Sequence, residues 1–174
     1  MAIEREIMKR GKKLKSISSV LGMLMFISGC AQDENFDAMF KRLTEGSVTV
    51  VQPEQAAEME GVLFLDAREP REFEVSHIDG ARCVGYDDFD INAISDLDKS
   101  KPVIVYCSVG YRSEKIGEKL LDDGFTDVYN LYGGIFHWVN TDQPVVSSEG
   151  KTNAVHAYNE KWGKWLEKGE KVYE

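Results

Sequence analysis

The sequence predicts an α/β fold in which a parallel sheet of about five strands is flanked by helices on both faces. Short apolar runs alternate with amphipathic helical segments through the middle of the chain, which is the pattern of repeated strand–helix–strand units. The run Val103–Tyr106 is strongly apolar, as a strand covered on both faces requires. Hydrophobic residues form 43% and charged residues 29% of the 174 residues, a balance typical of a folded domain.

A first helix is expected just before this domain. Phe36, Met39, Phe40 and Leu43 recur at helical spacing, and Gly46 follows as a stop signal. The pattern indicates an amphipathic helix that packs on the domain.

Five strands and their connecting segments then follow in order. The strands are expected at Val48–Val51, Val62–Leu65, Arg82–Val84, Val103–Tyr106 and Val128–Leu131. The connections are expected to be helices at Pro53–Glu60, Pro70–Val75 and Arg112–Asp123, an acidic loop or helical segment at Asp87–Asp98, and a short helix beginning near Gly133 and Gly134. Residues 48–146 are therefore expected to form one domain.

The tail, residues 147–174, is expected to be a separate aromatic segment. It begins with a predicted linker, Ser147–Gly150. Large apolar residues then recur at helical intervals: Tyr158, Trp162, Trp165 and Leu166. Because such a stripe is usually a packing surface, we expect a final helix that docks on the domain or binds a protein partner.

The first thirty residues predict an export signal with a lipid attachment site. A basic run, Lys9–Lys15, precedes 11 residues of mostly apolar character, Ile17–Ile27, about half of the roughly 20 that a spanning helix needs. Ser28 and Gly29 stand directly before Cys30, which resembles the lipobox of bacterial lipoproteins. The alternative is an ordinary cysteine after an uncleaved helix.

On the lipoprotein interpretation, residues 1–29 are removed and Cys30 carries the lipid. Residues 30–47 then form a tether and the N-terminal helix, and only the lipid contacts the membrane. We expect an exported protein on the periplasmic side of the cell envelope. The outer membrane is preferred because Ala31 stands where an aspartate favours the inner membrane, and the acidic run Gln32–Glu34 leaves surface export open.

The balance of charge excludes some classes of partner. The chain has 21 Lys and Arg against 30 Asp and Glu, a formal net charge of −9, so we expect no nucleic-acid partner. Residues 1–29 hold six of the basic and two of the acidic residues. Residues 30–174 therefore hold 15 basic and 28 acidic residues, a net charge of −13, which repels small dianions.

Cysteines and histidines are too sparse for a disulfide scaffold or a zinc site. With Cys30 acylated, only Cys83 and Cys107 remain. The three histidines lie far apart in sequence, at His77, His137 and His156. We expect no metal and no cofactor. Cys83 is interpreted as a core residue, and the alternative is a resolving thiol that forms a disulfide with Cys107.

The candidate reactive site lies where the apolar strand ends. Cys107 follows the strand, and a helix is expected to begin at Arg112, five residues later. Ligands bind at this end of open parallel sheets, and a tight loop entering a helix points backbone N–H groups at an anion. The same field favours a nucleophilic thiolate. The pattern predicts an activated Cys107 in an anion cradle, with Gly110 supplying a conformation that a β-carbon obstructs; the alternative is a buried structural cysteine.

Four segments, in the family's order, resemble motifs of the rhodanese family and together cover about residues 48–146. Cys107–Arg112, hereafter the cysteine loop, is similar to the family's six-residue active-site loop. Asp66–Phe73 resembles its Asp-x-Arg-x-x-x-Glu-aromatic segment, and His77–Ala81 resembles its His-Ile-x-Gly-Ala segment. Val128–Trp138 is similar to the strand and double-glycine turn that close the domain.

The resemblance implies a rhodanese-like fold and sulfurtransferase chemistry. Cys107 would take a sulfane sulfur from a donor such as thiosulfate or a persulfide and pass it to a thiol or cyanide. The backbone N–H groups of the cysteine loop would stabilise the thiolate and the terminal persulfide sulfur. These groups belong to Ser108, Val109, Gly110, Tyr111 and Arg112.

Four further residues are interpreted as support for the site: Asp66, Arg68, Glu72 and His77. Arg112 is expected either to pair with a carboxylate, for which Glu72 is one candidate, or to face an anionic donor. Many family members that use thiosulfate have a basic residue where this chain has Ser108. This difference and the acidic charge favour a neutral or protein-borne persulfide donor over a small dianion.

Two other function classes remain open. Related phosphatases and arsenate reductases use a similar loop of seven residues, and the smaller six-residue ring suits one sulfur atom better than a tetrahedral oxyanion. A rhodanese-like module can also be non-catalytic and serve as a binding or redox module, here with the aromatic tail as its interaction surface.

Overall fold

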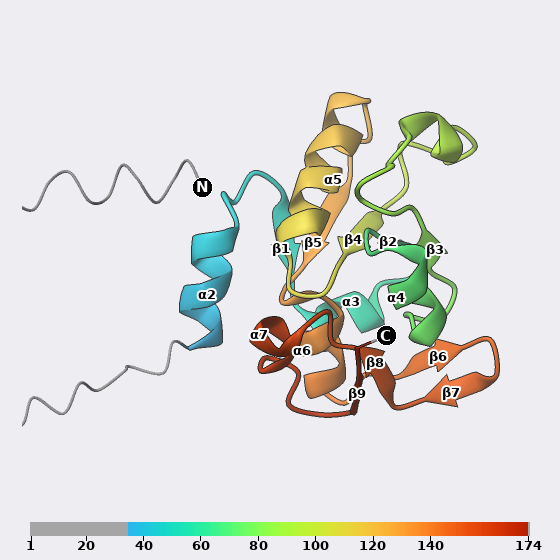
Figure 1. Ribbon diagram of the computed structural model, residues 1–174. Helices are drawn as coiled ribbons and strands as arrows, with labels where there is room; N and C mark the ends of the chain where they lie inside the picture. The colour runs from blue at the N-terminus through green and yellow to red at the C-terminus, as the bar shows by residue number, and fades with distance from the viewer. Residues whose placement is uncertain (1–34, 174) are drawn as a thin grey trace, which may run out of the picture. The chain divides into compact units, whose positions relative to one another are not determined.

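The computed structural model describes residues 35–173 (Figure 1). The expected signal peptide, the lipidation site Cys30 and most of the tether lie outside the described residues. Among residues 35–173, none of the helices has the length and apolar character needed to cross a membrane.

A five-stranded parallel sheet organises the described residues, which confirms the expected fold class. Its strands are β1 (Thr49–Val51), β2 (Leu63–Asp66), β3 (Arg82–Cys83), β4 (Val103–Tyr106) and β5 (Val128–Leu131). Their order across the sheet is β1-β5-β4-β2-β3, and every neighbouring pair is parallel. β4 therefore lies at the centre, with its carboxyl end at the edge where ligands bind in such sheets.

Helices cover both faces of the sheet. They are α2 (Phe36–Leu43), α3 (Pro53–Glu58), α4 (Pro70–Val75), α5 (Tyr111–Asp122) and α6 (Gly134–Asn140), with a 3-10 helix at Ile91–Ile94. Both α3 and α4 begin on proline within a capping box, which fixes the starts that the sequence indicated. The segment expected between Asp87 and Asp98 is thus mostly loop with one short helical turn.

The central strand explains why the core has two halves. Ile104 and Tyr106 enter an apolar cluster shared with α2 and α6, whereas Val103 and Val105 enter a second cluster shared with α5. None of these four side chains is more than 1% exposed. A continuously apolar strand is what such double-sided burial requires.

The C-terminal segment, residues 145–173, differs from the expected linker and helix. The expected linker is the turn of a hairpin between β6 (Val145–Ser147) and β7 (Gly150–Thr152). Parallel strands β8 (Ala154–His156) and β9 (Glu170–Val172) enclose the rest, and helix α7 is confined to Glu160–Gly163. The aromatic spacing was helical, but Tyr158 lies in a left-handed conformation (φ 63°) and short turns follow α7. The expected final helix is therefore limited to the four residues of α7.

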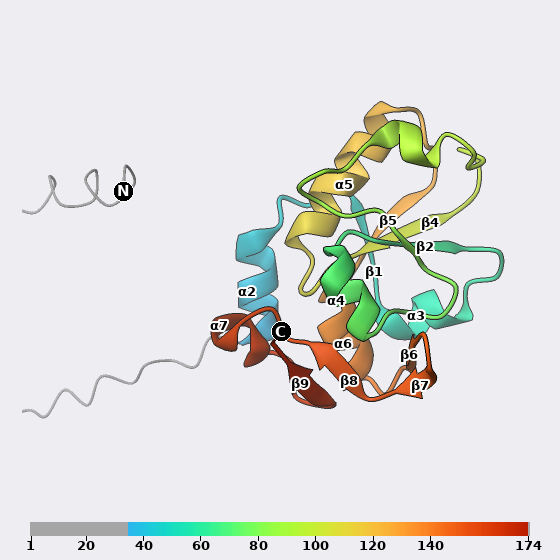
Figure 2. The same cartoon turned by 45° about the vertical axis from the view of Figure 1, so that its right-hand side comes forward.

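The same segment docks on the domain, which is one of the two roles expected for the aromatic tail. Val155, Ala157 and Leu166 are fully buried in the cluster shared with α6. Asn140, at the end of α6, donates to the Trp165 carbonyl at 2.9 Å and accepts backbone N–H bonds from the two residues after Leu166. Figure 2 shows α7 beside α2. Residues 35–173 belong to one compact unit, with no boundary at residue 146.

Candidate active site

The cysteine loop joins the end of β4 to the first turn of α5, which begins at Tyr111, one residue before the predicted start at Arg112. The backbone N–H of Gly110 donates to Sγ of Cys107 at 3.1 Å, and the Ser113 hydroxyl lies 3.5 Å from the same sulfur. The N-terminus of α5, with its positive potential, follows directly. The Gly110 N–H and the positive end of α5 stabilise negative charge on the Cys107 sulfur.

Gly110 adopts φ 114°, a conformation that favours glycine. A β-carbon there would lie 2.4 Å from the Phe40 ring, so α2 packs closely over the loop. Asn130 of β5 fixes the loop from the sheet side, because its amide donates to the Gly110 carbonyl at 3.0 Å. Its amide oxygen accepts from the Ser113 hydroxyl at 2.7 Å. The role of Asn130 was not visible in the sequence, since it depends on the pairing of β4 with β5.

The N-terminus of α6 binds the carbonyl groups of the cysteine loop. The N–H of Ile135 donates to the Cys107 carbonyl at 2.8 Å, and the N–H of Phe136 donates to the Ser108 carbonyl at 3.3 Å. A β-carbon on Gly134 would lie 2.2 Å from the Cys107 carbonyl oxygen, so this approach requires glycine. These contacts give the double-glycine turn a physical role that the motif alone did not show.

Arg112 pairs with Glu72, as one of the two sequence alternatives proposed. The guanidinium donates to both carboxylate oxygens, at 2.7 and 2.8 Å, and to the Ser108 hydroxyl at 3.0 Å. Ser108 in turn donates to Glu72 at 3.3 Å. Burial opposes ionisation of Glu72, but the hydrogen bonds and charge of Arg112 hold its pKa below the ordinary value. The guanidinium is thus occupied by the protein itself.

Asp66 and Arg68 support the site from the interior. Both side chains are fully buried, and Arg68 binds the Asp66 carboxylate through Nε and through Nη2, the latter at 2.6 Å. The same Nη2 donates to the Ser76 carbonyl at 2.7 Å. His77 bonds through Nδ1 to the Phe73 carbonyl at 3.0 Å and stacks on the Phe73 ring. None of Asp66, Arg68 and His77 lines the pocket described next, and their supporting role stays a prediction.

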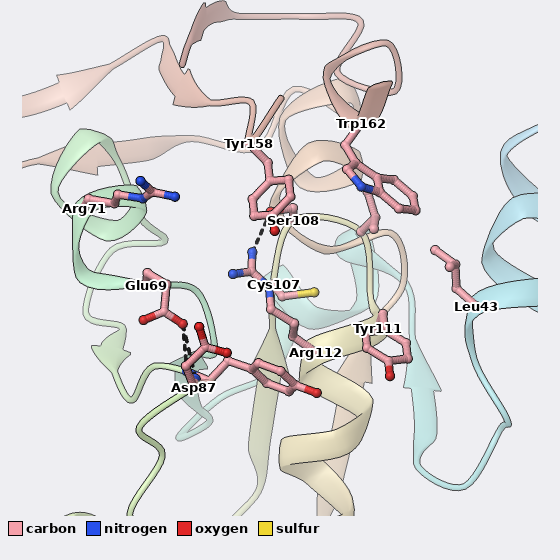
Figure 3. A pocket seen from close by; sticks show the side chains of 12 residues that line it. Leu43, Glu69, Arg71, Asp87, Cys107, Ser108, Tyr111, Arg112, Tyr158 and Trp162 are labelled. Carbon is pink, nitrogen blue, oxygen red and sulfur yellow. Dashed lines mark hydrogen bonds between the residues drawn. The ribbon is translucent and has the colours of Figure 1, made fainter. Parts of the chain in front are cut away.

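A pocket of about 450 Å³ opens above Cys107 (Figure 3). Three kinds of residue line it: cysteine-loop residues, charged residues of α4 and the neighbouring loops, and apolar or aromatic residues. They are Leu43, Glu69, Arg71, Tyr86, Asp87, Cys107, Ser108, Val109, Tyr111, Arg112, Tyr158 and Trp162. Cys107 is 1% exposed, so its sulfur is reached through this pocket. The sequence did not assign Leu43, Tyr158 or Trp162 to the site, although their aromatic and apolar spacing was noted.

Cys83 and Cys107 are separated by strand β2. Asp66 of β2 is in register with Cys83 on one side and with Tyr106 on the other. Two strand spacings put the Cα atoms of Cys83 and Tyr106 about 9–10 Å apart, and Cys107 follows Tyr106. A disulfide needs Cα atoms within about 7 Å. Burial and the Asp66 charge also raise the pKa of Cys83.

Within residues 35–173, no group of three or more His, Cys, Asp or Glu side chains is arranged to hold a metal ion. The acidic loop near Asp87 contributes to the pocket but not to such a group.

Known proteins share this fold and sequence pattern. A thiosulfate sulfurtransferase, GlpE of Pseudomonas aeruginosa (strain LESB58), is 35% identical over 104 residues, which cover 58% of this chain and 92% of that protein. A rhodanese-related protein of Thermoplasma volcanium is 27% identical, with a TM-score of 0.51 over 56% of this chain and 97% of its own. A rhodanese-like domain from Anabaena is 23% identical, with a TM-score of 0.52 over 56% of this chain and 78% of its own, a likeness of fold.

The model of the rhodanese-like domain family matches residues 51–141, which is more than half of the chain. This range contains all five strands except the start of β1, the cysteine loop and the Glu72–Arg112 pair. The chain therefore belongs to the rhodanese-like domain family.

Proposed function

We propose that this protein is a sulfurtransferase in which Cys107 carries a sulfane sulfur as a persulfide. The observation that carries the proposal is the Gly110 N–H bond to the Cys107 sulfur, inside a loop that opens α5. The similarity to a thiosulfate sulfurtransferase supports it. The donor is thiosulfate or a persulfide, and the acceptor is a thiol or cyanide.

In the first half-reaction, the Cys107 thiolate attacks the sulfane sulfur of the donor. With thiosulfate, the S–S bond to the sulfonate breaks, sulfite leaves with the electron pair, and the anionic persulfide Cys107–S–S⁻ forms. Backbone N–H groups of the cysteine loop stabilise the charge on both sulfurs. The bonds from α6 to the carbonyls of Cys107 and Ser108 fix the loop in which the Gly110 N–H meets the sulfur.

In the second half-reaction, the acceptor attacks the terminal sulfur of the persulfide. Cyanide leaves as thiocyanate, or a thiolate leaves as a new persulfide, and the Cys107 thiolate is restored. Glu72 keeps Arg112 and Ser108 in place during both steps through its hydrogen bonds. Since Arg112 is engaged by this carboxylate, it does not present a free fork to a phosphate or arsenate, which argues against those chemistries.

The decisive experiment measures sulfur loading of Cys107 in the purified full-length protein. Thiosulfate, a thiol persulfide and inorganic polysulfide are offered in turn, and intact mass spectrometry follows the addition of about 32 Da, one sulfur atom. Loading and cyanide-dependent turnover are expected in wild type and in Cys83→Ser, and neither in Cys107→Ser. Absence of the adduct with all three donors contradicts the proposal and favours a non-catalytic module.

We further propose that the protein is exported and anchored to the cell envelope through Cys30. The support is the order of basic run, short apolar run, small residues and cysteine in residues 9–30. Mass spectrometry of the mature N-terminus is expected to find a lipid-modified Cys30 as the first residue, and Cys30→Ala is expected to lose the lipid. An unmodified Cys30 still joined to residues 1–29 contradicts the proposal.

A further inference from the structure

Three side chains that line the pocket lie outside the part of the chain that the family model matches. Leu43 comes from α2, and Tyr158 and Trp162 come from the C-terminal segment (Figure 3). Together with Tyr86 and Tyr111, they make the walls above Cys107 largely apolar and aromatic. Part of the wall above Cys107, hereafter the entrance, therefore comes from outside the range that the family model matches.

Tyr158 is the clearest sign that this entrance is functional. Its φ of 63° is unfavourable for a tyrosine, and such strain concentrates at functional sites. Its backbone N–H donates to Nδ1 of the buried His156 at 3.1 Å, which holds the conformation. Yet the residue is 43% exposed, so core packing does not explain the strain. Its ring faces the Arg112 guanidinium, whose Cζ atom lies 5.3 Å from the ring centroid.

The charges in the pocket do not match a small dianion. Arg112 is neutralised by Glu72 and covered by the Tyr158 ring. Arg71 forms no ion pair with the described residues 35–173, whereas Glu69 and Asp87 add two carboxylates. A small dianion such as thiosulfate would therefore meet one cation without an ion pair among the described residues, Arg71, and two carboxylates, Glu69 and Asp87. A donor with an apolar body avoids this repulsion and gains from contact with the aromatic walls.

We propose that the entrance formed by the C-terminal segment makes this site selective for small organic persulfides that carry an apolar body and at most one negative charge. The inference rests on the proposed sulfur transfer. The pocket volume lies in the range of small-ligand sites, which favours a small molecule over a folded protein. The apolar body lies against Tyr158 and Trp162, and the sulfane sulfur reaches Cys107.

The reaction is a balanced exchange. The Cys107 thiolate attacks the terminal sulfur of R–S–SH, a new bond forms between the two sulfurs, and the original S–S bond breaks. R–S⁻ leaves with the electron pair, and the terminal sulfur keeps its proton in Cys107–S–SH. No external oxidant or reductant is needed.

The test compares benzyl persulfide with 2-hydroxyethyl persulfide, each generated in situ, on the full-length protein. In wild type, kcat/KM for cysteine loading is expected to favour the benzyl donor by about tenfold or more, from the apolar area that the ring buries. Tyr158→Gly removes the aromatic wall and also relieves the strained backbone, so the variant is expected to fold. It is expected to reduce the preference about tenfold, mostly through the benzyl donor.

Two variants serve as matched controls. Tyr158→Phe keeps the ring and is expected to keep the preference, and Tyr173→Ala removes a tyrosine of similar exposure that does not line the pocket. A wild-type ratio near one, or an unchanged ratio in Tyr158→Gly, overturns the inference. Inorganic polysulfide separates the two proposals: if it loads Cys107, sulfur transfer stands whatever the ratio, and if no donor loads Cys107, both proposals fail.

Discussion

The cysteine loop and the C-terminal segment meet at one pocket but are held in place by different means. The loop is fixed by directed hydrogen bonds: Gly110 N–H to the cysteine sulfur, α6 N–H groups to the carbonyls of Cys107 and Ser108, and the Asn130 amide to the Gly110 carbonyl. The C-terminal segment is fixed by distant apolar packing, through Val155 and Leu166, and by Asn140. Hydrogen bonds therefore position the cysteine, and apolar packing positions the residues through which a substrate approaches it.

The largest expected effect comes from breaking the loop itself. Gly134→Ala places a β-carbon against the Cys107 carbonyl oxygen, and neither backbone can yield without losing the α6 contacts. We expect the free energy of unfolding to fall by about 3–4 kcal/mol, and sulfur loading of Cys107 to be lost. Chemical denaturation and intact mass spectrometry measure the two effects.

Gly61→Ala is the matched control, because Gly61 also has a positive φ (68°) but open space around it. The free energy of unfolding should fall by only about 1 kcal/mol, the cost of placing an alanine in a left-handed conformation, and sulfur loading of Cys107 should be unchanged. Equal losses of stability and sulfur loading in the two variants would contradict a specific role for the contact between α6 and the loop.

The second effect concerns the ion pair that supports the loop. Glu72→Gln leaves the Arg112 guanidinium partly buried without its carboxylate, and we expect a loss of about 2–3 kcal/mol in unfolding free energy. The pKa of Glu72 is lowered on folding, so its contribution to stability is present above the ordinary value of 4.5 and disappears as the pH falls below it.

Wild type should therefore lose more stability than Glu72→Gln between pH 6 and acid, and the two unfolding curves should converge. Denaturant titrations at several pH values measure this convergence. A constant difference between the proteins down to low pH would contradict the role assigned to the Glu72 charge. Within the described chain, the Asn140 side chain bonds only to Trp165, Glu167 and Lys168 of the C-terminal segment and not to Glu72 or Arg112, so Asn140→Ala should leave this pH dependence unchanged.

The same contrast separates what the sequence predicted from what it did not. The strand Val103–Tyr106 and the loop after it could be predicted, because the apolar run, Gly110 and Arg112 stand close together in sequence. The role of Asn130 was hidden, since it arises from the neighbouring strand β5.

The extent of the helix in the aromatic tail was predicted wrongly for a related reason. Trp162, Trp165 and Leu166 have helical spacing, but three residues can also turn inward through consecutive tight turns. What decides between the two is the left-handed Tyr158 before them and the pairing of β8 with β9, which are tertiary features. The local sequence does not predict that Tyr158 lines the pocket above Cys107.

A smaller, local effect tests how the C-terminal segment is held. Asn140→Ala removes one donated and two accepted hydrogen bonds to residues 165–168, so we expect that segment to open more readily by about 1–2 kcal/mol. Hydrogen exchange should accelerate at the amides of β8 and β9 but not at those of β4. Uniform acceleration in both regions would show that the segment does not open independently of the sheet.

The smallest effect is expected at Cys83, which lies within the family domain but away from the pocket. Cys83 is half-buried, its thiol donates to the Arg68 carbonyl at 3.7 Å, and β2 lies between it and the strand that ends at Cys107. A serine hydroxyl can donate to the same carbonyl, so Cys83→Ser should leave sulfur loading unchanged. Mild oxidation should consume the Cys107 thiol equally in wild type and in the variant, because no disulfide forms across two strand spacings. A peptide linking Cys83 to Cys107 after digestion would show instead that the sheet edge moves far enough to join them, and the cysteine loop would then be less rigid than its backbone hydrogen bonds require.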